Sequence, residues 1–236
     1  MRNSIAAPVD LPRSQTTNPY WDIMRTFPGS GIDWQYDSVW SPDWSSAYMD
    51  GIKKQSRNDL CREYTWSIPD PITLEFITEW VKPAAIEMGA GTGYWAWQLS
   101  QLDVNIIAFD EVPPQIKSGN HWHSPRDEQE EKLQGKTRSV FFDVQEGTPE
   151  TLEKYADRIL FLCWPPKSDM ALECLKHYQG KRLVYIGEGD GGCTASEEFF
   201  EKLEQEWEEK ASHRPIQWSG IHDYVTVYER IEVQNV

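Results

Sequence analysis

Apolar and polar positions alternate along residues 70–236 with two periods, and each period predicts one kind of element. Five short apolar runs have the length of a single buried strand. They are AAIEM (84–88), VNIIAFD (104–110), SVFFDV (139–144), RILFLCW (158–164) and RLVYIGE (182–188). Strands that alternate with helices favour a doubly wound, mostly parallel α/β sheet with both faces covered.

Helical periodicity occupies most of the intervals between these runs. DPITLEFITEWV (70–81) predicts a helix with Asp70 as N-cap and Pro71 at its first position. SEEFFEKLEQEWEEK (196–210) places its large apolar side chains on one face of a predicted helix. Shorter helices are expected at YWAWQLSQL (94–102), TPETLEKYA (148–156) and SDMALECLKHY (168–178).

The chain ends with a predicted hairpin. IQWSG (216–220) and DYVTVYERIEV (223–233) have strand-like patterns, and a turn around Gly220 and His222 joins them. Two strands joined by so short a turn must be antiparallel. The predicted sheet therefore has seven strands, with an antiparallel hairpin at its C-terminal end.

The first 69 residues differ from the rest of the chain. Residues 1–18 are polar and predict a flexible arm, whereas residues 19–69 are rich in Trp and Tyr. We expect this aromatic segment to form a cap over a ligand-binding domain at 70–236. Tyr20 and Trp21 are candidates for a lid over the substrate.

Composition limits the classes of partner. The formal net charge is −15, which disfavours a large nucleic-acid footprint and suits a small or cationic substrate, although solubility alone would also explain it. The 4 Cys form no CxxC pair, which indicates free thiols in a reducing cytoplasm. No apolar run reaches the roughly 20 residues of a membrane span. His121 and His123 lack an evident third ligand, so no metal site is predicted.

A glycine-rich turn follows the first predicted strand and precedes a helix. Glu87, Gly89, Gly91 and Gly93 give the spacing ExGxGxG, and Asp110 ends the next strand. Glycines at such a turn let backbone N–H groups approach a ligand, and the acid can accept both hydroxyls of a ribose. A dinucleotide fingerprint would need a glycine at the position of Tyr94, which disfavours a nicotinamide oxidoreductase.

EMGAGTG followed by AFD resembles the motifs of class I S-adenosylmethionine-dependent methyltransferases, over residues 70–232. The resemblance implies a Rossmann-like methyltransferase fold with S-adenosyl-L-methionine as cofactor. It implies that Glu87 lies near the methionine ammonium and that Asp110 binds the ribose hydroxyls. The remaining cofactor-binding candidates lie at the ends of the predicted strands: Gly89, Ala90, Gly91, Glu111, Asp143 and Val144 (beside the adenine), and Cys163.

The acceptor would lie over the carboxyl end of the fourth predicted strand, at Trp164-Pro165-Pro166-Lys167. This segment resembles the Asp/Asn-Pro-Pro-aromatic motif of amino-methylating members, but Trp164 replaces the polar residue and Lys167 the aromatic one. Nucleobase amino methylation is therefore not favoured. Trp164 is instead a candidate to stack on a flat substrate or a cation, with Pro165 beside it.

Two further residues are candidates for proton transfer or substrate binding. Glu188 follows the fifth predicted strand in a glycine-rich loop, and His222 lies in the predicted hairpin turn. A carboxylate and an imidazole are natural general bases. With Trp164 they form the candidate catalytic set.

The function expected from these residues is methylation of a small molecule at N or O by in-line transfer. Two alternatives remain open. The substrate could be a protein or a nucleic acid, or the chain could be a non-enzymatic module that binds the cofactor or serves as a scaffold.

Overall fold

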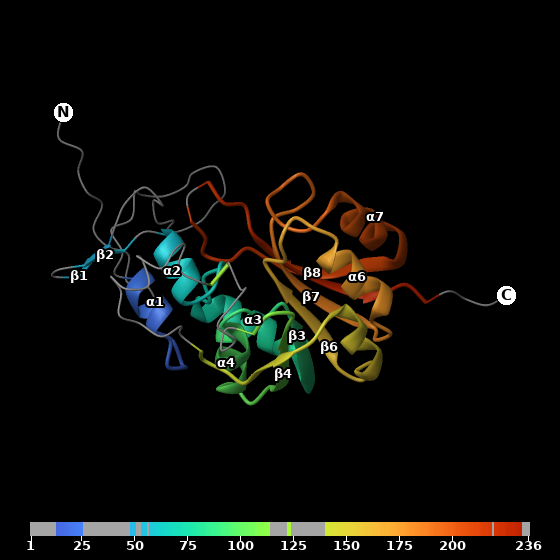
Figure 1. Ribbon diagram of the computed structural model, residues 1–236, viewed down its shortest axis with the longest axis horizontal. Helices are drawn as coiled ribbons and strands as arrows, with labels where there is room; N and C mark the ends of the chain where they lie inside the picture. The colour runs from blue at the N-terminus through green and yellow to red at the C-terminus, as the bar shows by residue number, and fades with distance from the viewer. Residues whose placement is uncertain are drawn as a thin grey trace.

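The computed structural model describes residues 13–25, 48–50, 53–55, 57–113, 122–123, 140–218 and 220–232. Within these ranges, helices alternate with the strands of one large sheet (Figure 1). The helices are α1 (Pro19–Met24), α2 (Arg57–Glu63), α3 (Pro71–Val81), α4 (Tyr94–Ser100), η1 (Pro149–Lys154, a 3₁₀ helix), α6 (Met170–His177) and α7 (Glu197–Glu206). The strands are β1 (Tyr48–Asp50), β2 (Lys53–Gln55), β3 (Ala84–Met88), β4 (Asn105–Asp110), β5 (Val144–Glu146), β6 (Ile159–Cys163), β7 (Arg182–Gly187), β8 (Trp207–His213) and β9 (Tyr224–Arg230).

The large sheet is 7-stranded, with the order β5-β4-β3-β6-β7-β9-β8. Strands β5, β4, β3, β6 and β7 are parallel to one another, whereas β9 is antiparallel to both β7 and β8. The strand order reverses direction beside β3, which is where ligands bind in open α/β sheets. The predicted doubly wound sheet with a C-terminal antiparallel hairpin is therefore confirmed.

Helices cover both faces of this sheet (Figure 1). One core layer joins α3 and α4 to the sheet through residues such as Leu74, Ile77 and Trp95. The other joins α6 and α7 to the opposite face through residues such as Leu175 and Phe199. Because successive strand residues point to opposite faces, each inner strand feeds both layers and reads as a continuous apolar run.

The start of α3 follows the sequence prediction closely. The side chain of Asp70 accepts hydrogen bonds from the N–H groups of Ile72 and Thr73, at 3.0 and 3.1 Å. These contacts satisfy two donors that have no partner within the helix. Pro71 occupies the first helical position, where its missing N–H costs nothing.

The third strand lies further along the chain than predicted. Its observed bounds are Val144–Glu146, whereas the apolar pattern predicted 139–144. The backbone N–H of Phe141 donates to the carbonyl of Thr92 at 3.0 Å and not to a strand. The Phe141 ring packs instead against Tyr94 and Trp97, with centroids 4.7 and 5.4 Å away.

The C-terminal hairpin also differs from its prediction. Helix α7 ends at Glu206, and Trp207 starts β8, so the first hairpin strand is 207–213 and not 216–220. Trp207 turns away from the helical path because its ring stacks on Tyr178, at 6.3 Å, and lies 4.3 Å from the guanidinium carbon of Arg230. The next residues are charged and exposed, as suits an edge strand.

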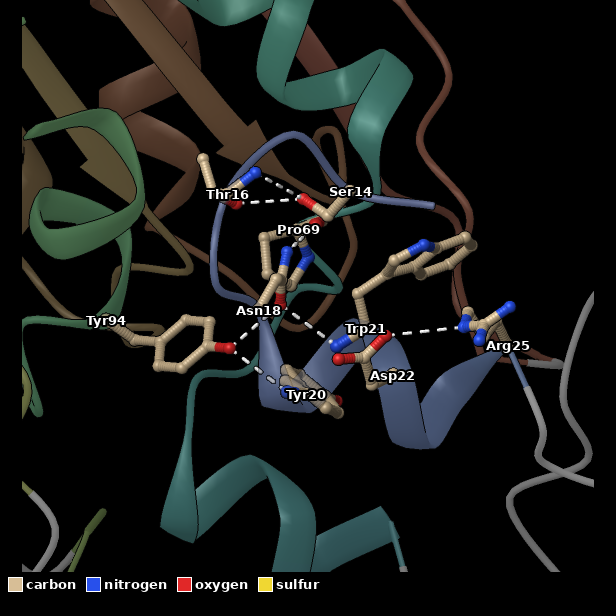
Figure 2. Close-up of polar contacts among 9 residues, drawn as sticks. All are labelled: Ser14, Thr16, Asn18, Tyr20, Trp21, Asp22, Arg25, Pro69 and Tyr94. Atoms are coloured by element: carbon tan, nitrogen blue, oxygen red, sulfur yellow. Dashed lines mark hydrogen bonds and ion pairs between the residues drawn. The ribbon is translucent and has the colours of Figure 1, made fainter. Parts of the chain in front are cut away.

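The described part of the N-terminal segment packs against α4. Asn18 accepts hydrogen bonds from the Tyr94 hydroxyl, at 2.8 Å, and from the N–H of Trp21, at 3.0 Å (Figure 2). Thr16 and Thr17 are hydrogen-bonded to glutamine side chains of α4 and the turn after it. Residues 16–18, predicted to belong to a flexible arm, are therefore tied to the domain, whereas residues 1–12 lie outside the described ranges.

Tyr20 and Trp21 do not form a lid. Both are 0% exposed and belong to a third core cluster that also contains Tyr64, Tyr94 and Trp218. The Tyr20 ring stacks on Tyr64 at 5.1 Å. Their role in the described structure is to fix α1 and α2 to the domain.

No helix in the part of the chain described is long and apolar enough to cross a membrane.

Candidate functional site

A cavity of about 440 Å³ opens at the carboxyl ends of β3, β4 and β6. Its volume falls in the range of small-molecule sites. It is lined by the glycine turn after β3, by acidic side chains, by three tryptophans and by the Pro165-Pro166 segment. The sequence-predicted residues that line the cavity are Glu87, Gly89, Ala90, Gly91, Asp110, Glu111, Cys163, Trp164 and Pro165.

The glycine turn has a backbone that other residues would strain. Gly89 and Gly91 have φ angles of +75° and +54°. A Cβ atom at Gly89 would lie 2.8 Å from Met170 Cε, and one at Gly91 would lie 2.3 Å from His123 Nε2. Both positions therefore favour glycine for conformation, and at Gly91 the His123 ring also leaves little space for a side chain.

Asp110 binds the glycine turn directly. Its Oδ2 accepts a hydrogen bond from the N–H of Gly91, and its Oδ1 accepts one from the N–H of Val112, both at 2.9 Å. Burial raises the pKa of Asp110 although these two hydrogen bonds lower it. Each carboxylate oxygen can accept a second donor, so the group can also receive two hydroxyls from a ligand.

Glu87 is the most deeply buried acid of the cavity wall, with 2% of its surface exposed. Its Oε2 atom has no hydrogen-bond partner in the part of the chain that the structure describes. Burial raises the pKa of Glu87 to about 8, and the nearby Asp110 raises it further, while the N–H of Ala96 lowers it. A buried carboxyl oxygen without a donor indicates a place for a ligand donor such as an ammonium group.

Part of the cavity wall is aromatic. Trp66, Trp122 and Trp164 all line it. Trp66 stacks on Trp164, with centroids 5.7 Å apart and planes at 17°, and meets Trp122 edge to face, at 6.0 Å and 85°. We call these three side chains the tryptophan wall.

Trp164 is held by several contacts at once. Its backbone has a φ of +51°, its N–H donates to the carbonyl of Ile186 at 2.8 Å, and its indole N–H donates to both carboxylate oxygens of Asp223 at 2.9 Å. Burial raises the pKa of Asp223 to about 7, whereas the indole hydrogen bond lowers it. Because the indole N–H is engaged by Asp223, Trp164 serves as a wall and not as a proton carrier.

Glu188 and His222, two candidate bases, do not line the cavity. The carboxylate of Glu188 accepts the N–H groups of Cys193 and His222, at 2.8 and 2.9 Å. Burial opposes ionisation of Glu188, but these hydrogen bonds lower its pKa below the usual value. The His222 ring is 3.5 Å from the same carboxylate and about half exposed. In the described structure Glu188 organises two loops.

Asp143 and Val144 are also absent from the cavity wall. Asp143 was predicted to follow the third strand, but it precedes β5 and is exposed. Val144 is 1% exposed and packs in the core layer under α3 and α4. The shift of the third strand is the physical reason, because it moves both residues away from the carboxyl end of the sheet.

Several cavity residues were not predicted from the sequence as site residues, among them Thr65, Trp66 and His123. Thr65 and Trp66 come from the chain after α2, which the sequence assigned only to an aromatic cap. His123 comes from the long segment after β4 and lies against Gly91. Contacts between such distant segments leave no periodic pattern, and the richness in Trp was the one usable indication.

His123 is uncharged at neutral pH. Burial lowers its pKa to about 4. Its Nδ1 lies 3.2 Å from the carbonyl of Arg62, which can only accept, so the proton belongs on Nδ1 and Nε2 faces the glycine turn. Among the described residues there is no cluster of His, Cys, Asp and Glu suited to a metal ion, and His121 lies outside them.

Comparisons with known proteins find similar solved structures and no family. No family model matches the chain, and no curated protein matches it. Solved structures similar to it include a magnesium protoporphyrin IX methyltransferase from Synechocystis PCC 6803, with 10% identity, a TM-score of 0.42, and coverage of 68% of this chain and 79% of that one.

Two further solved structures are similar to this chain. A SAM-dependent O-methyltransferase from Thermotoga maritima has 13% identity, a TM-score of 0.45, and coverage of 81% of this chain and 79% of that one. A ribosomal protein L11 methylase from Lactobacillus delbrueckii subsp. bulgaricus has 13% identity, a TM-score of 0.37, and coverage of 68% and 78%. At such identities the likeness concerns the arrangement of sheet and helices alone.

Proposed function

We propose that this chain binds S-adenosyl-L-methionine and transfers its methyl group to a small molecule at N or O. The observation that carries the proposal is the meeting of Glu87, the glycine turn and Asp110 in one cavity at the carboxyl ends of β3 and β4. This combination offers one partner for an ammonium group and another for a ribose diol, separated by backbone that only glycine permits.

The residues that line the cavity fit the chemical groups of the cofactor. The Oε2 atom of Glu87, which is buried and has no partner in the described structure, would receive the ammonium of the methionine part. The carboxylate of Asp110 would receive the ribose hydroxyls in addition to the N–H of Gly91. The Gly89–Gly91 turn would pass beneath the cofactor. When bound, the cofactor supplies a methyl group made electrophilic by its sulfonium.

The protein would contribute position and a dry environment. A lone pair on the acceptor N or O forms the new bond to the methyl carbon, while the electron pair of the broken S–C bond stays on sulfur and the acceptor proton passes to solvent. Such a transfer needs the acceptor atom held about 3 Å from the methyl and in line with sulfur. Pro165 and Trp164, at the end of β6, border the cavity where that acceptor would lie.

A small acceptor is favoured over a macromolecule. Most of the cavity wall is apolar or acidic, with Lys167 and His123 as its basic side chains among the described residues. The formal net charge of −15 would repel a phosphate backbone.

Cofactor binding is tested by titrating S-adenosylhomocysteine into the wild type, Asp110→Asn and Asp157→Asn. Asp157 is an exposed acid at the amino end of β6, on the opposite edge of the sheet from the cavity, so it controls for loss of charge. We expect binding to the wild type and Asp157→Asn, and a clear loss for Asp110→Asn. Absence of binding to the wild type would contradict the proposal.

The acceptor class is tested by incubating the protein and tritiated S-adenosyl-L-methionine with cell extracts. Label that survives protease and nuclease treatment in the low-molecular-weight fraction supports a small molecule. Label that protease or nuclease releases from large material would assign a protein or nucleic-acid substrate instead. Cofactor binding without label in any fraction would favour a non-enzymatic module.

A further inference from the structure

The tryptophan wall is not part of the hydrophobic core. Trp66, Trp122 and Trp164 belong to none of the buried clusters that hold the described structure together. Trp122 is 46% exposed. Large aromatic side chains that do not fill the core, yet line a cavity, need another explanation.

Trp164 is held in a conformation that costs free energy. A φ of +51° places an aromatic residue in the left-handed region, at a cost of about 1–2 kcal/mol. The hydrogen bonds to Ile186 and Asp223 and the stack on Trp66 together keep it there. Several contacts maintain this backbone strain at a cavity wall. We infer that the placement of the Trp164 ring matters for function.

A positive charge beside the tryptophan wall determines which planar ligands can bind there. The guanidinium carbon of Arg57 lies 5.5 Å from the Trp66 ring and 5.4 Å from the Trp164 ring. Arg57 is 8% exposed, and its Nε and Nη2 atoms have no hydrogen-bond partner among the described residues. A cation therefore already faces both rings, and a second cation in the cavity would be repelled.

Two further charged groups near the tryptophan wall also bear on the charge of its ligand. Lys167 lines the cavity, and its Nζ donates to the carbonyl of Gly192 at 3.1 Å. The acid that contacts the wall is Asp223, whose carboxylate accepts the indole N–H of Trp164 and whose pKa is raised to about 7 by burial. The basic groups near the tryptophan wall are thus distinct from Glu87 and Asp110, which would meet the ammonium group and the ribose of the cofactor.

We propose that the tryptophan wall binds a planar aromatic acceptor that carries no positive charge, such as a phenol or an aromatic acid. The ring of the acceptor would stack against Trp122 and Trp164, with its nucleophilic atom directed toward the glycine turn. This inference rests on the proposed function for the kind of reaction. The class of ligand is inferred from the tryptophan wall alone.

The test uses three probes of similar size. They are 1-naphthol, its saturated analogue decahydro-1-naphthol, and the cation 1-naphthyltrimethylammonium. Each is titrated into the full chain by calorimetry, with and without saturating S-adenosylhomocysteine. We expect 1-naphthol to bind about tenfold or more tightly than either of the other probes, because stacking and charge both favour it.

Variants locate the binding. Trp122→Leu removes an exposed wall ring and should weaken 1-naphthol about fivefold to tenfold, while Trp122→Phe should retain most of the affinity. Trp80→Leu is the matched control, because Trp80 lies on α3, packs against Arg182 and is not among the residues that line the cavity. Circular dichroism of each variant confirms that it folds.

The outcomes separate the two proposals. Equal binding of 1-naphthol and its saturated analogue, or tightest binding of the cation, overturns the assignment of the wall. So does an unchanged affinity in Trp122→Leu. If 1-naphthol behaves as expected but S-adenosylhomocysteine does not bind, the wall assignment stands and the proposed function fails.

Discussion

The carboxylate of Asp110 accepts a hydrogen bond from the backbone N–H of Gly91 at 2.9 Å, and this contact joins the ends of β3 and β4 into one ligand-binding edge. The two residues are 19 positions apart in the chain. The contact orients the acid that would meet the ribose and fixes the turn that would pass beneath the cofactor. Several predictions about individual residues depend on it.

Removal of the Asp110 carboxylate should cost stability as well as affinity. Asp110→Ala leaves the N–H groups of Gly91 and Val112 without their acceptor, which costs about 1–3 kcal/mol for a buried donor. Asp110→Asn keeps one acceptor oxygen and should lose less stability, yet bind S-adenosylhomocysteine poorly. Urea denaturation and calorimetric titration measure the two effects separately, and equal stability of both variants would argue against the contact.

Gly91→Ala should abolish cofactor binding. The new Cβ would meet His123 Nε2 at 2.3 Å, and the φ of +54° disfavours any side chain. Gly189→Ala is the matched control, because nothing lies within 4 Å of its Cβ position and its φ is outside the left-handed region. Titration of S-adenosylhomocysteine into both variants checks this, and binding that survives in Gly91→Ala would show that the turn does not touch the ligand.

Glu87 should make the stability of the ligand-free protein fall as the pH rises from 4.5 toward 8, whereas His123, whose pKa burial lowers from 6.5 to about 4, acts in the opposite direction in the lower part of this range. The pKa of Glu87 is raised from 4.5 to about 8 by burial, so in this window the folded protein holds a proton that the unfolded chain has released. The contribution of Glu87 to the free energy of unfolding therefore decreases with rising pH. Asp223, whose pKa is raised to about 7, acts in the same direction.

Glu87→Gln isolates the contribution of Glu87 to this pH dependence. The variant removes the titrating group but keeps the shape of the side chain, so its stability should decline less between pH 4.5 and 8. Denaturant midpoints at several pH values measure the difference. Parallel curves for wild type and Glu87→Gln would mean that Glu87 is not buried as the structure has it.

Trp207→Ala tests the unexpected boundary between α7 and β8. Trp207 is 4% exposed, stacks on Tyr178 and lies against Arg230, so its truncation should cost about 3–5 kcal/mol. Ile72→Ala, at a residue 56% exposed, should change stability by no more than about 0.5 kcal/mol. Chemical denaturation compares the two, and a small loss for Trp207→Ala would speak for a helix that continues past Glu206.

Local patterns in the sequence predicted much of this molecule. The bounds of β3 match the run AAIEM, and the Asp70 cap and Pro71 place the start of α3. The glycine turn and Asp110 were found because their spacing has a direct chemical meaning. Each of these features depends on residues that are close in sequence, or on the parallel arrangement that alternating strands and helices impose.

The errors arose where tertiary contacts override local pattern. The Phe141 ring joins the cluster around Tyr94, which moves the third strand along the chain and takes Asp143 out of the site. Trp207 continues the helical periodicity of α7 but packs as the first residue of β8. The meeting of Trp66 with Trp164 joins segments almost 100 residues apart, and no periodicity encodes it.

The central claim is that the carboxyl group of Glu87 binds the ammonium group of an adenosyl-amino-acid. It is tested most directly by titrating S-adenosylhomocysteine and 5′-methylthioadenosine, which lacks the amino-acid part, into wild type and Glu87→Gln. Glu87→Gln should weaken S-adenosylhomocysteine at least about tenfold, as expected for a lost charged partner, and leave 5′-methylthioadenosine unchanged. Equal losses for the two ligands, or no loss for S-adenosylhomocysteine, would contradict the account.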